Sequence, residues 1–309
     1  MKLVLMSGFL NRSCPLCAAP AALVAEISSR PIGESLSFSD LTCHWNGLFK
    51  KRIFFSYERC KNCGLLFTPT FFDERQLAEL YAQMPPNMEV VPTDALRRTQ
   101  RGYFETLKAH STLEGGFIEV GPDVGLFTGN CVREGRFDPY WLIEPNRDVI
   151  PALSATMGSA HFHVTHAMTG YGHIPDASAG AVVMIQVLDH LLEPLVALKD
   201  LRAKLRPDGK LLIVTHDESS ILRRVFGPRW PAFCLQHPQI YNPRSIKALV
   251  ELAGYRLIEI KRTTNYFPVE FLLKNLAWAS GMKIDKVPSF GGLSLGLKLG
   301  NMITLATPC

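Results

Sequence analysis

The sequence predicts an α/β fold in which a mostly parallel sheet is covered by helices on both faces and follows a small metal-binding module. Two observations carry this prediction. From Gly116 onward, short apolar segments alternate with amphipathic segments, which is the pattern of strands joined by helices. Ahead of that region, four cysteines stand in two Cys-x-x-Cys pairs, a spacing typical of metal ligands in an intracellular chain.

The composition excludes several classes of protein. The 309 residues are 47% hydrophobic and 20% charged, which is enough apolar material for one large domain or two smaller ones. The net charge of +5 comes without a dense run of Lys or Arg, so we expect no nucleic-acid partner, although an anionic small substrate is compatible with it. No segment approaches the roughly 18 apolar residues of a membrane helix. The apolar start at Met1–Met6 is too short for a signal peptide, so we expect a cytoplasmic protein.

The two cysteine pairs predict a structural zinc site. Two residues between the cysteines of a pair let both sulfurs turn toward one ion, and two pairs supply the four thiolates of a tetrahedral Zn²⁺ site. The predicted ligands are Cys14, Cys17, Cys60 and Cys63. Four unrelated cysteines are the alternative. A four-thiolate site has no open position, so its role would be structural. We place this module at residues 1–75 and a helical linker at 76–112.

The main domain is expected to span residues 113–309. Its predicted strands, in chain order, are 117–120, 140–143, 161–164, 181–187, 211–215, 255–261 and 302–306. Helices are expected to begin near Leu126, Asn146 and Pro194, and a turn is expected at 206–209. The segment 262–300 is longer than a hairpin needs. This insertion either covers the substrate cleft or forms a homodimer face through its apolar residues Leu272, Leu273, Leu276 and Trp278.

The first predicted strand leads into a glycine turn, which indicates a nucleotide-binding site. Glu119 lies near the end of that strand, and Gly121 and Gly125 follow it. Glycines let the backbone approach a ligand closely, and the helix start that follows offers free N–H groups. Glu144 ends the second strand, where an acid can accept hydrogen bonds from both ribose hydroxyls of an adenosine. The alternative for Glu144 is an ordinary surface acid at a strand end.

Taken together, four features resemble class I S-adenosylmethionine-dependent methyltransferases. They are the Glu-Val-Gly-x-x-x-Gly-x-Phe turn, the Glu that ends the second strand, and the segments VLDHLLEPLVALKDLRAKLRPDGKLLIV and AGYRLIEIKR. The paired cysteines ahead of them narrow the resemblance to bacterial methyltransferases of deoxysugar nucleotides and related natural products, including the tetronitrose C-methyltransferase group. The resemblance covers nearly the whole chain. It implies a Rossmann-like seven-stranded methyltransferase sheet whose last strand is antiparallel.

The resemblance also implies roles for individual residues. It assigns the methionine part of S-adenosylmethionine to Glu119, Gly121 and Gly125, the ribose to Glu144, and the pocket wall after the fourth strand to Gln186 and Val187. The turn departs from the family pattern at two positions. Pro122 removes an N–H donor, and Asp123 adds a negative charge where the methionine carboxylate would lie.

Three residues are candidates for catalysis. In the resembled family a His lies in the loop before the next helix, which corresponds here to His237, and it is a candidate general base because its pKa lies near working pH. His216 at the end of the fifth strand competes for that role. Tyr241 either orients the substrate or packs in the core. The resemblance implies a small hydroxylated substrate, such as a nucleotide-linked sugar or a natural-product intermediate, methylated on carbon or oxygen.

Two other classes of function remain open. A nicotinamide-dependent oxidoreductase would also use a glycine turn and a ribose-binding acid, but its turn reads Gly-x-Gly-x-x-Gly, and this one reads Gly-x-x-x-Gly. The other class is a non-catalytic binding module that has kept the fold. The altered turn, together with the lack of a clear adenine-binding acid within 165–172, favours that reading.

Overall fold

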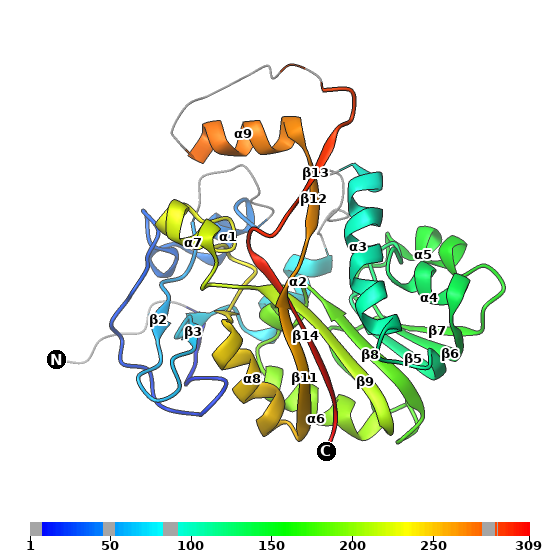
Figure 1. Cartoon of the computed structure of the whole chain (residues 1–309). Coiled ribbons are helices and arrows are strands. Elements are labelled where there is room, and N and C mark those ends of the chain that lie inside the picture. Colours follow the sequence, from blue (N-terminus) through cyan, green and yellow to red (C-terminus); the bar gives the residue numbers. More distant parts are fainter. Residues whose placement is uncertain (1–7, 46–52, 83–91, 280–287, 289) are drawn as a thin grey trace.

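A computed structural model describes residues 8–45, 53–82, 92–279, 288 and 290–309 (Figure 1). The apolar start at Met1–Met6 lies outside these ranges. None of the helices within them is long and apolar enough to cross a membrane.

A seven-stranded sheet forms the centre of the molecule, as the sequence predicts. The strand order is β11-β14-β9-β8-β5-β6-β7. β14 runs antiparallel to both of its neighbours, and the other strand pairs are parallel. The strands are β5 (Glu114–Val120), β6 (Arg136–Ile143), β7 (Phe162–Thr165), β8 (Ala179–Ile185), β9 (Leu205–His216), β11 (Tyr255–Arg262) and β14 (Asn301–Pro308).

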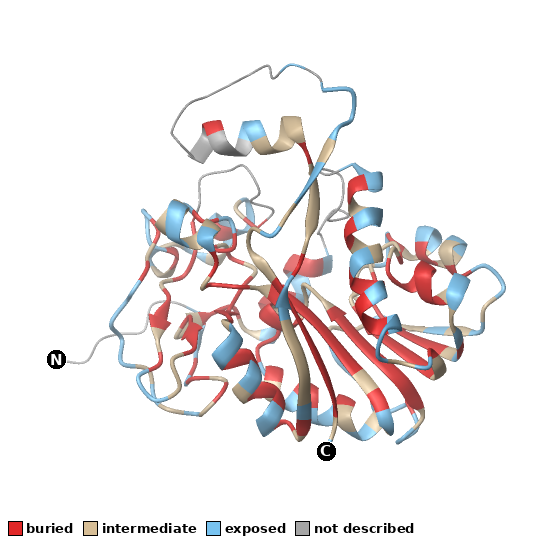
Figure 2. Ribbon diagram, in the orientation of Figure 1, coloured by how far each residue is buried: buried red, intermediate tan, exposed pale blue. Residues whose placement is uncertain are grey.

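Helices cover both faces of this sheet (Figure 1). One face carries α3 (Thr93–Lys108), α4 (Thr128–Glu134) and α5 (Ile150–Met157), and the other carries α6 (Pro194–Lys204) and α8 (Pro243–Leu252). Alternate side chains of a strand point to opposite faces, so each strand supplies two cores. In β8, Ala181 and Val183 pack under α3–α5, whereas Val182 and Met184 pack under α6 and α8. Figure 2 shows that β5, β8 and β14 are buried along most of their length, whereas the edge strands β7 and β11 are mostly intermediate or exposed.

Two predicted secondary-structure elements within the main domain differ from the structure. The expected turn at 206–209 belongs to β9, where it forms a bulge: Ala179 pairs with Leu205, but Ala181 pairs with Lys210. The helix expected to begin at Asn146 begins at Ile150 instead. The Asn146 side chain accepts a hydrogen bond from the Asp148 N–H at 2.9 Å, so it stabilises a turn two residues on rather than a helix start.

The N-terminal residues form small strands and helices that share a sheet with the main domain. β10 (Gln239–Ile240), from late in the chain, pairs with β3 (Leu66–Phe67), which pairs with β2 (Glu58–Arg59). β1 (Leu10–Asn11) pairs with β4 (Thr70–Phe71). The helical pieces are η1 (Gly33–Ser35), α1 (Phe38–Thr42) and α2 (Glu74–Ala82). The N-terminal residues and the main domain therefore pack against each other at the joint formed by β3 and β10. The domain boundaries given above stay predictions.

An arm lies between β11 and β14. β12 (Asn265–Pro268) pairs antiparallel with β13 (Ser294–Leu297), and α9 (Val269–Ala279) follows β12. The arm begins where β11 ends, beside the end of β9, so it stands above the carboxyl edge of the sheet (Figure 1). Of its predicted apolar residues, Leu272 is half-buried and Leu273 is exposed. The side chains of Leu276 and Trp278 lie outside the described ones.

Candidate functional site

The glycine turn after β5 has the backbone geometry that the sequence predicts for it. Gly121 and Gly125 have φ angles of +69° and +78°, a region that favours glycine. A Cβ atom at Gly121 would lie 2.6 Å from Val187 Cγ2, and one at Gly125 would lie 2.8 Å from Leu153 Cδ1. Both positions therefore require glycine for conformation and for space.

Glu119 is a buried carboxyl group at the inner end of this turn. It is 2% exposed, and its described partner is the Thr128 hydroxyl, which donates to it from the first turn of α4. Burial raises the pKa of Glu119 to about 8, the Thr128 hydrogen bond opposes that rise, and the carboxylates of Glu144 and Asp123 add to it. The free protein thus holds an uncompensated acid where the cofactor is expected.

Glu144 closes the turn from the neighbouring strand. It is 6% exposed; its Oε2 accepts the Asp123 N–H, and its Oε1 accepts the Asn146 N–H, each at 2.9 Å. Burial raises the pKa of Glu144, and these two hydrogen bonds oppose the rise. Each carboxylate oxygen accepts more than one hydrogen bond, so both retain capacity for a ribose hydroxyl. Asp123 holds a φ of +52°, and burial raises its pKa.

Gln186 and Val187 follow β8 and lie at the same edge. Val187 contacts the turn at Gly121. Gln186 has a φ of +55°, and its buried Nε2 has no hydrogen-bond partner among the residues that the structure describes. A buried amide donor is rarely left unpaired in a complete structure. The orphaned donor, the buried Glu119 carboxyl group without a described cationic partner and the glycine cradle therefore fit a bound polar cofactor.

A second group of polar side chains lies at the carboxyl ends of β8 and β9. Asp189, in the short helix η2 (Leu188–His190), is fully buried. Its Oδ2 accepts a hydrogen bond from His216 Nδ1 at 2.7 Å, and its Oδ1 has no partner within the described chain. Burial alone would raise the pKa of Asp189, but the hydrogen bond and charge of His216 outweigh it and hold the pKa below its usual range. Asp189 is an ionised partner that orients His216.

His216 has one ring nitrogen free for a ligand. Its Nδ1 is bound to Asp189, whereas the described contacts give its Nε2 no hydrogen-bond partner. The side chain is 22% exposed. Burial lowers the pKa of His216 below 6.5, and the Asp189 hydrogen bond opposes that fall. The imidazole is therefore neutral at neutral pH and can accept a proton at Nε2.

His237 lies beside His216, with ring centroids 4.6 Å apart, but both of its nitrogens are engaged. Its Nδ1 donates to the Ala232 carbonyl at 2.7 Å, and its Nε2 lies 3.1 Å from His190 Nε2. Burial would lower the pKa of His237, yet the Cys234 thiol and Asp189 outweigh it and raise the pKa to about 9. The structure thus brings the two predicted histidines together. The role of His237 as general base stays a prediction.

Tyr241 lies in the core. Its side chain is fully buried in the cluster that contains Cys14 and Cys60, and its hydroxyl has no described hydrogen-bond partner. Burial raises the pKa of this hydroxyl. Substrate orientation by Tyr241 stays a prediction, and its position leaves it to act through neighbouring residues.

Asp189, His216 and His237 also place one potential metal-ligand atom each within 4.8 Å of one another. The hydrogen bonds already described link Asp189 to His216 Nδ1 and His237 Nε2 to His190. Because Asp189 Oδ2, His216 Nδ1 and His237 Nε2 are already engaged in these hydrogen bonds, we interpret the cluster as an acid–base network.

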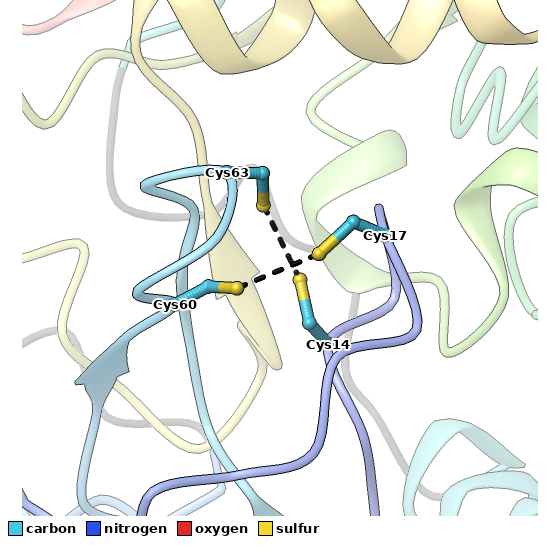
Figure 3. A group of neighbouring side chains, drawn as sticks. All are labelled: Cys14, Cys17, Cys60 and Cys63. Carbon is cyan, nitrogen blue, oxygen red and sulfur yellow. Dashed lines mark hydrogen bonds between the residues drawn. The ribbon is translucent and has the colours of Figure 1, made fainter.

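The four predicted zinc ligands come together in a separate cluster. Cys14 and Cys17 lie on one loop and Cys60 and Cys63 on another, and Figure 3 shows all four sulfurs turned toward a common point. The Cys14–Cys63 and Cys17–Cys60 sulfur pairs are each 3.5 Å apart. A tetrahedral zinc site with bonds of about 2.3 Å spaces its sulfurs about 3.8 Å apart. Geometry and donor set both fit zinc.

The protonation of these thiols agrees with a need for a cation. Burial raises the pKa of Cys14 well above its usual range and that of Cys63 to about 11. At Cys17, hydrogen bonds outweigh burial and lower the pKa to about 7. Metal-bound cysteines are thiolates, so a divalent ion would displace the protons of the buried thiols.

The sequence reasoning missed four residues of the site: Asp189, His190, Thr128 and Tyr81. Asp189 and His190 lie in η2, shortly after the end of β8, and the rule that ligands bind at the carboxyl ends of parallel strands could have identified them. Tyr81 lies in α2, and no local pattern links it to a histidine over a hundred residues later in the chain.

Comparison with known proteins agrees with this architecture. A family model described as a methyltransferase domain matches residues 94–260. One solved structure is the complex between the Haloferax volcanii Trm112 methyltransferase activator and a methyltransferase. A chain of this complex superposes with a TM-score of 0.50 at 11% identity, over 70% of this chain and 92% of that one. A Galdieria sulphuraria protein assigned as a sarcosine dimethylglycine methyltransferase gives 0.51 at 12% identity, over 70% and 87%. At these identities the likeness establishes the fold. No curated protein matches the sequence.

Proposed function

The chain belongs to the methyltransferase-domain family and is a class I S-adenosylmethionine-dependent methyltransferase, and from that premise we propose which residues carry the transfer and which substrates it takes. The observation that supports the proposal best is the Asp189–His216 pair, with its free Nε2, at the sheet edge that also holds the glycine turn.

The cofactor side of the site uses the residues around the glycine turn. S-adenosylmethionine supplies an electrophilic methyl group on a positively charged sulfur. Glu119 offers a carboxylate to its cationic methionine portion, Glu144 offers acceptors for the ribose hydroxyls, and Gln186 Nε2 offers a donor. Gly121 and Gly125 leave room for the backbone to approach the ligand.

His216 is the general base. Methyl transfer is a displacement, so the protein mainly aligns the two reactants, and a base is needed when the acceptor is a hydroxyl or a carbon acid. His216 Nε2 would accept the proton that the acceptor loses, and the bound cofactor would supply the methyl group and leave as its thioether. Asp189 holds His216 in the tautomer with Nδ1 protonated and stabilises the imidazolium that forms. The neighbouring His237 remains the second candidate for this role.

The substrate is a small hydroxylated molecule, either a nucleotide-linked sugar or a natural-product intermediate, methylated on carbon or oxygen. The net charge of +5 is compatible with an anionic substrate. The segment formed by α7 (Ile221–Phe226) and η3 (Gly227–Arg229) begins shortly after the end of β9 and carries Arg223, Arg224 and Arg229. Such cations suit a diphosphate group. The arm covers this side of the site or mediates a homodimer.

The four cysteines hold one structural Zn²⁺ ion. Their closeness and their complete set of four sulfurs support this assignment. Metal analysis of purified protein should give about one zinc per chain, and the Cys60→Ser variant should give much less. Wild-type protein without zinc would refute the site.

A cofactor and acceptor screen tests the proposed function. Calorimetry should detect binding of S-adenosylmethionine and no binding of NAD. Transfer of a labelled methyl group to a panel of nucleotide-linked deoxysugars and their free sugars should then label the nucleotide-linked members. His216→Gln should lower turnover by about 100-fold or more while cofactor affinity stays unchanged. Binding of NAD alone, or full turnover in His216→Gln, would contradict the proposal.

A further inference from the structure

A tyrosine of the predicted linker packs on the four-cysteine module and contacts the cluster formed by His190, His216 and His237. Tyr81, in α2, places its hydroxyl oxygen 2.8 Å from His190 Nδ1. The ring is 9% exposed and packs edge-on against Trp45, with centroids 5.1 Å apart. The surrounding apolar cluster joins module residues such as Phe72 to Leu192, two residues beyond His190. The position of this hydroxyl is therefore set by the packing of the module.

Tyr81 is the outer member of a hydrogen-bonded chain. It contacts His190 Nδ1, and His190 Nε2 lies 3.1 Å from His237 Nε2. His237 Nδ1 ends the chain by donating to the Ala232 carbonyl at 2.7 Å. Because a carbonyl only accepts, the Nδ1 of His237 must carry a proton. One further hydrogen lies between the two Nε2 atoms. Whether it is bonded to His190 or to His237 decides the protonation of all three side chains.

Two arrangements satisfy every contact in this chain. In the first, Tyr81 donates to His190 Nδ1, and His190 Nε2–H donates to a neutral His237. In the second, a doubly protonated His237 donates to His190 Nε2, and His190 Nδ1–H donates to the Tyr81 oxygen. They differ by one proton, and a hydroxyl serves both because it can donate or accept. Burial lowers the pKa of His190 to about 3, so His190 stays neutral in each.

The module also holds the backbone of the His237 loop. The Tyr57 hydroxyl donates to the His237 carbonyl at 2.6 Å. β3 pairs with β10, which begins two residues after His237. Arg12, which is 9% exposed, donates to the Leu192 carbonyl at 2.7 Å and to Gln239 Oε1 at 3.1 Å. Both histidine-bearing loops are thus fastened to the module by hydrogen bonds.

Resting on the proposed function, we propose that Tyr81 is a positioning residue of the transfer site: its hydroxyl pairs with His190 Nδ1 in either arrangement and thereby sets the balance between the two protonation states of His237, so that a residue packed on the four-cysteine module completes the site. His237 faces several other groups that can titrate or carry charge. They are Cys234 on its own loop, Asp189 and His190 on η2, and His216 on β9. Tyr81 acts on His237 through His190 and does not touch the substrate.

Imidazole ¹⁵N NMR of the full-length, zinc-loaded protein tests this assignment. Tyr81→Phe keeps the buried ring and removes only the hydroxyl. Its His190 signals should move because Nδ1 loses its partner, and the pH midpoint of His237 should shift by up to about one unit, the size of one hydrogen bond. Tyr171→Phe is the matched control, because Tyr171 is buried with a hydroxyl that has no described partner and lies outside this cluster. The imidazole signals of the Tyr171→Phe variant should match those of the wild type.

Wild-type imidazole signals and midpoints in Tyr81→Phe would overturn the proposal. The spectra require no methyl acceptor, so this outcome leaves the proposed methyl transfer intact, and failure of the acceptor screen leaves the spectra interpretable. With an acceptor from the screen, Tyr81→Phe should lower kcat about tenfold, with unchanged affinity for S-adenosylmethionine. An unchanged kcat and an unchanged pH profile would equally contradict a positioning role.

Discussion

Glu119 and Asp189 are both buried carboxyl groups at the carboxyl edge of one sheet, yet their pKa values move in opposite directions. Glu119 is 2% exposed and Asp189 is fully buried, so burial penalises the charge of both. Glu119 has a described hydroxyl partner, and its pKa rises to about 8. Asp189 has an imidazole partner at 2.7 Å, and its pKa falls. The partner, and not the burial, decides the charge.

This difference separates two tasks within one site. Asp189 already has its counter-group inside the protein and is ready to orient His216. Glu119 faces the carboxylates of Glu144 and Asp123, which raise its pKa further, and it therefore lacks a cation. S-adenosylmethionine carries positive charge on its sulfur and its amino group. We infer that the cofactor supplies the positively charged partner of Glu119, whereas Asp189 already has its partner, His216, inside the protein.

The largest expected effect comes from Asp189→Asn. The amide keeps the shape but removes the charge that holds His216 and stabilises its protonated form, so kcat should fall by about 100-fold or more. Affinity for S-adenosylmethionine, measured by calorimetry, should stay close to that of the wild type. Asp176→Asn, at an exposed acid paired with Lys204, is the control and should retain turnover. A parallel loss of cofactor affinity in Asp189→Asn would contradict the assignment of catalysis to Asp189 and of cofactor binding to Glu119.

Glu119→Gln should show the reverse pattern. It removes the carboxylate offered to the cationic cofactor, so affinity should weaken by about tenfold or more. The folded-state pKa of about 8 lies above the ordinary 4.5, so the wild type loses stability as pH rises between these values. The free variant escapes this loss and should be about 4 kcal/mol more stable at pH 8 in urea unfolding, with little difference near pH 4.5.

The exposed Glu79→Gln variant serves as the control for both measurements, since its acid lies on the surface of α2. Equal stability of Glu119→Gln and the wild type at pH 8 would show that the buried acid is already compensated in the free protein.

The smallest expected effect is on the pH profile of turnover. His216 must be unprotonated to accept a proton, and burial lowers its pKa below 6.5. Activity at saturating substrate should therefore hold through neutral pH and fall only on the acid side of 6.5. A steady-state profile between pH 5 and 8 measures this. An acid limb centred well above 7 would transfer the role of base from His216 to a group with a higher pKa, such as His237.

The sequence was most informative where function depends on local pattern. The seven strands, the glycine turn and the two cysteine pairs each arise from residues close in the chain, and the structure places all of them as expected. Boundaries set by a bulge, as at Arg206–Gly209, were missed because a proline and a glycine predict a turn equally well. Tyr241 was assigned to either the substrate or the core, and it lies in the core.

The least predictable part is the histidine cluster. His190 lies in η2, His216 ends β9, His237 lies in the loop before β10, and Tyr81 comes from α2 in the predicted linker. Their meeting depends on the joint between β3 and β10 and on the buried Arg12, which are long-range contacts without a sequence period. Proximity of this kind follows only from the tertiary fold.

The most direct test of the different charge states is a count of the protons released when S-adenosylmethionine binds at pH 7. Calorimetry in buffers of different ionisation enthalpy gives that number. Glu119 is largely protonated in the free protein and should ionise beside the cationic cofactor, so the wild type should release more protons than Glu119→Gln, by up to one per site. Protons from the cofactor itself contribute to both. Equal proton counts in the two proteins would contradict the account.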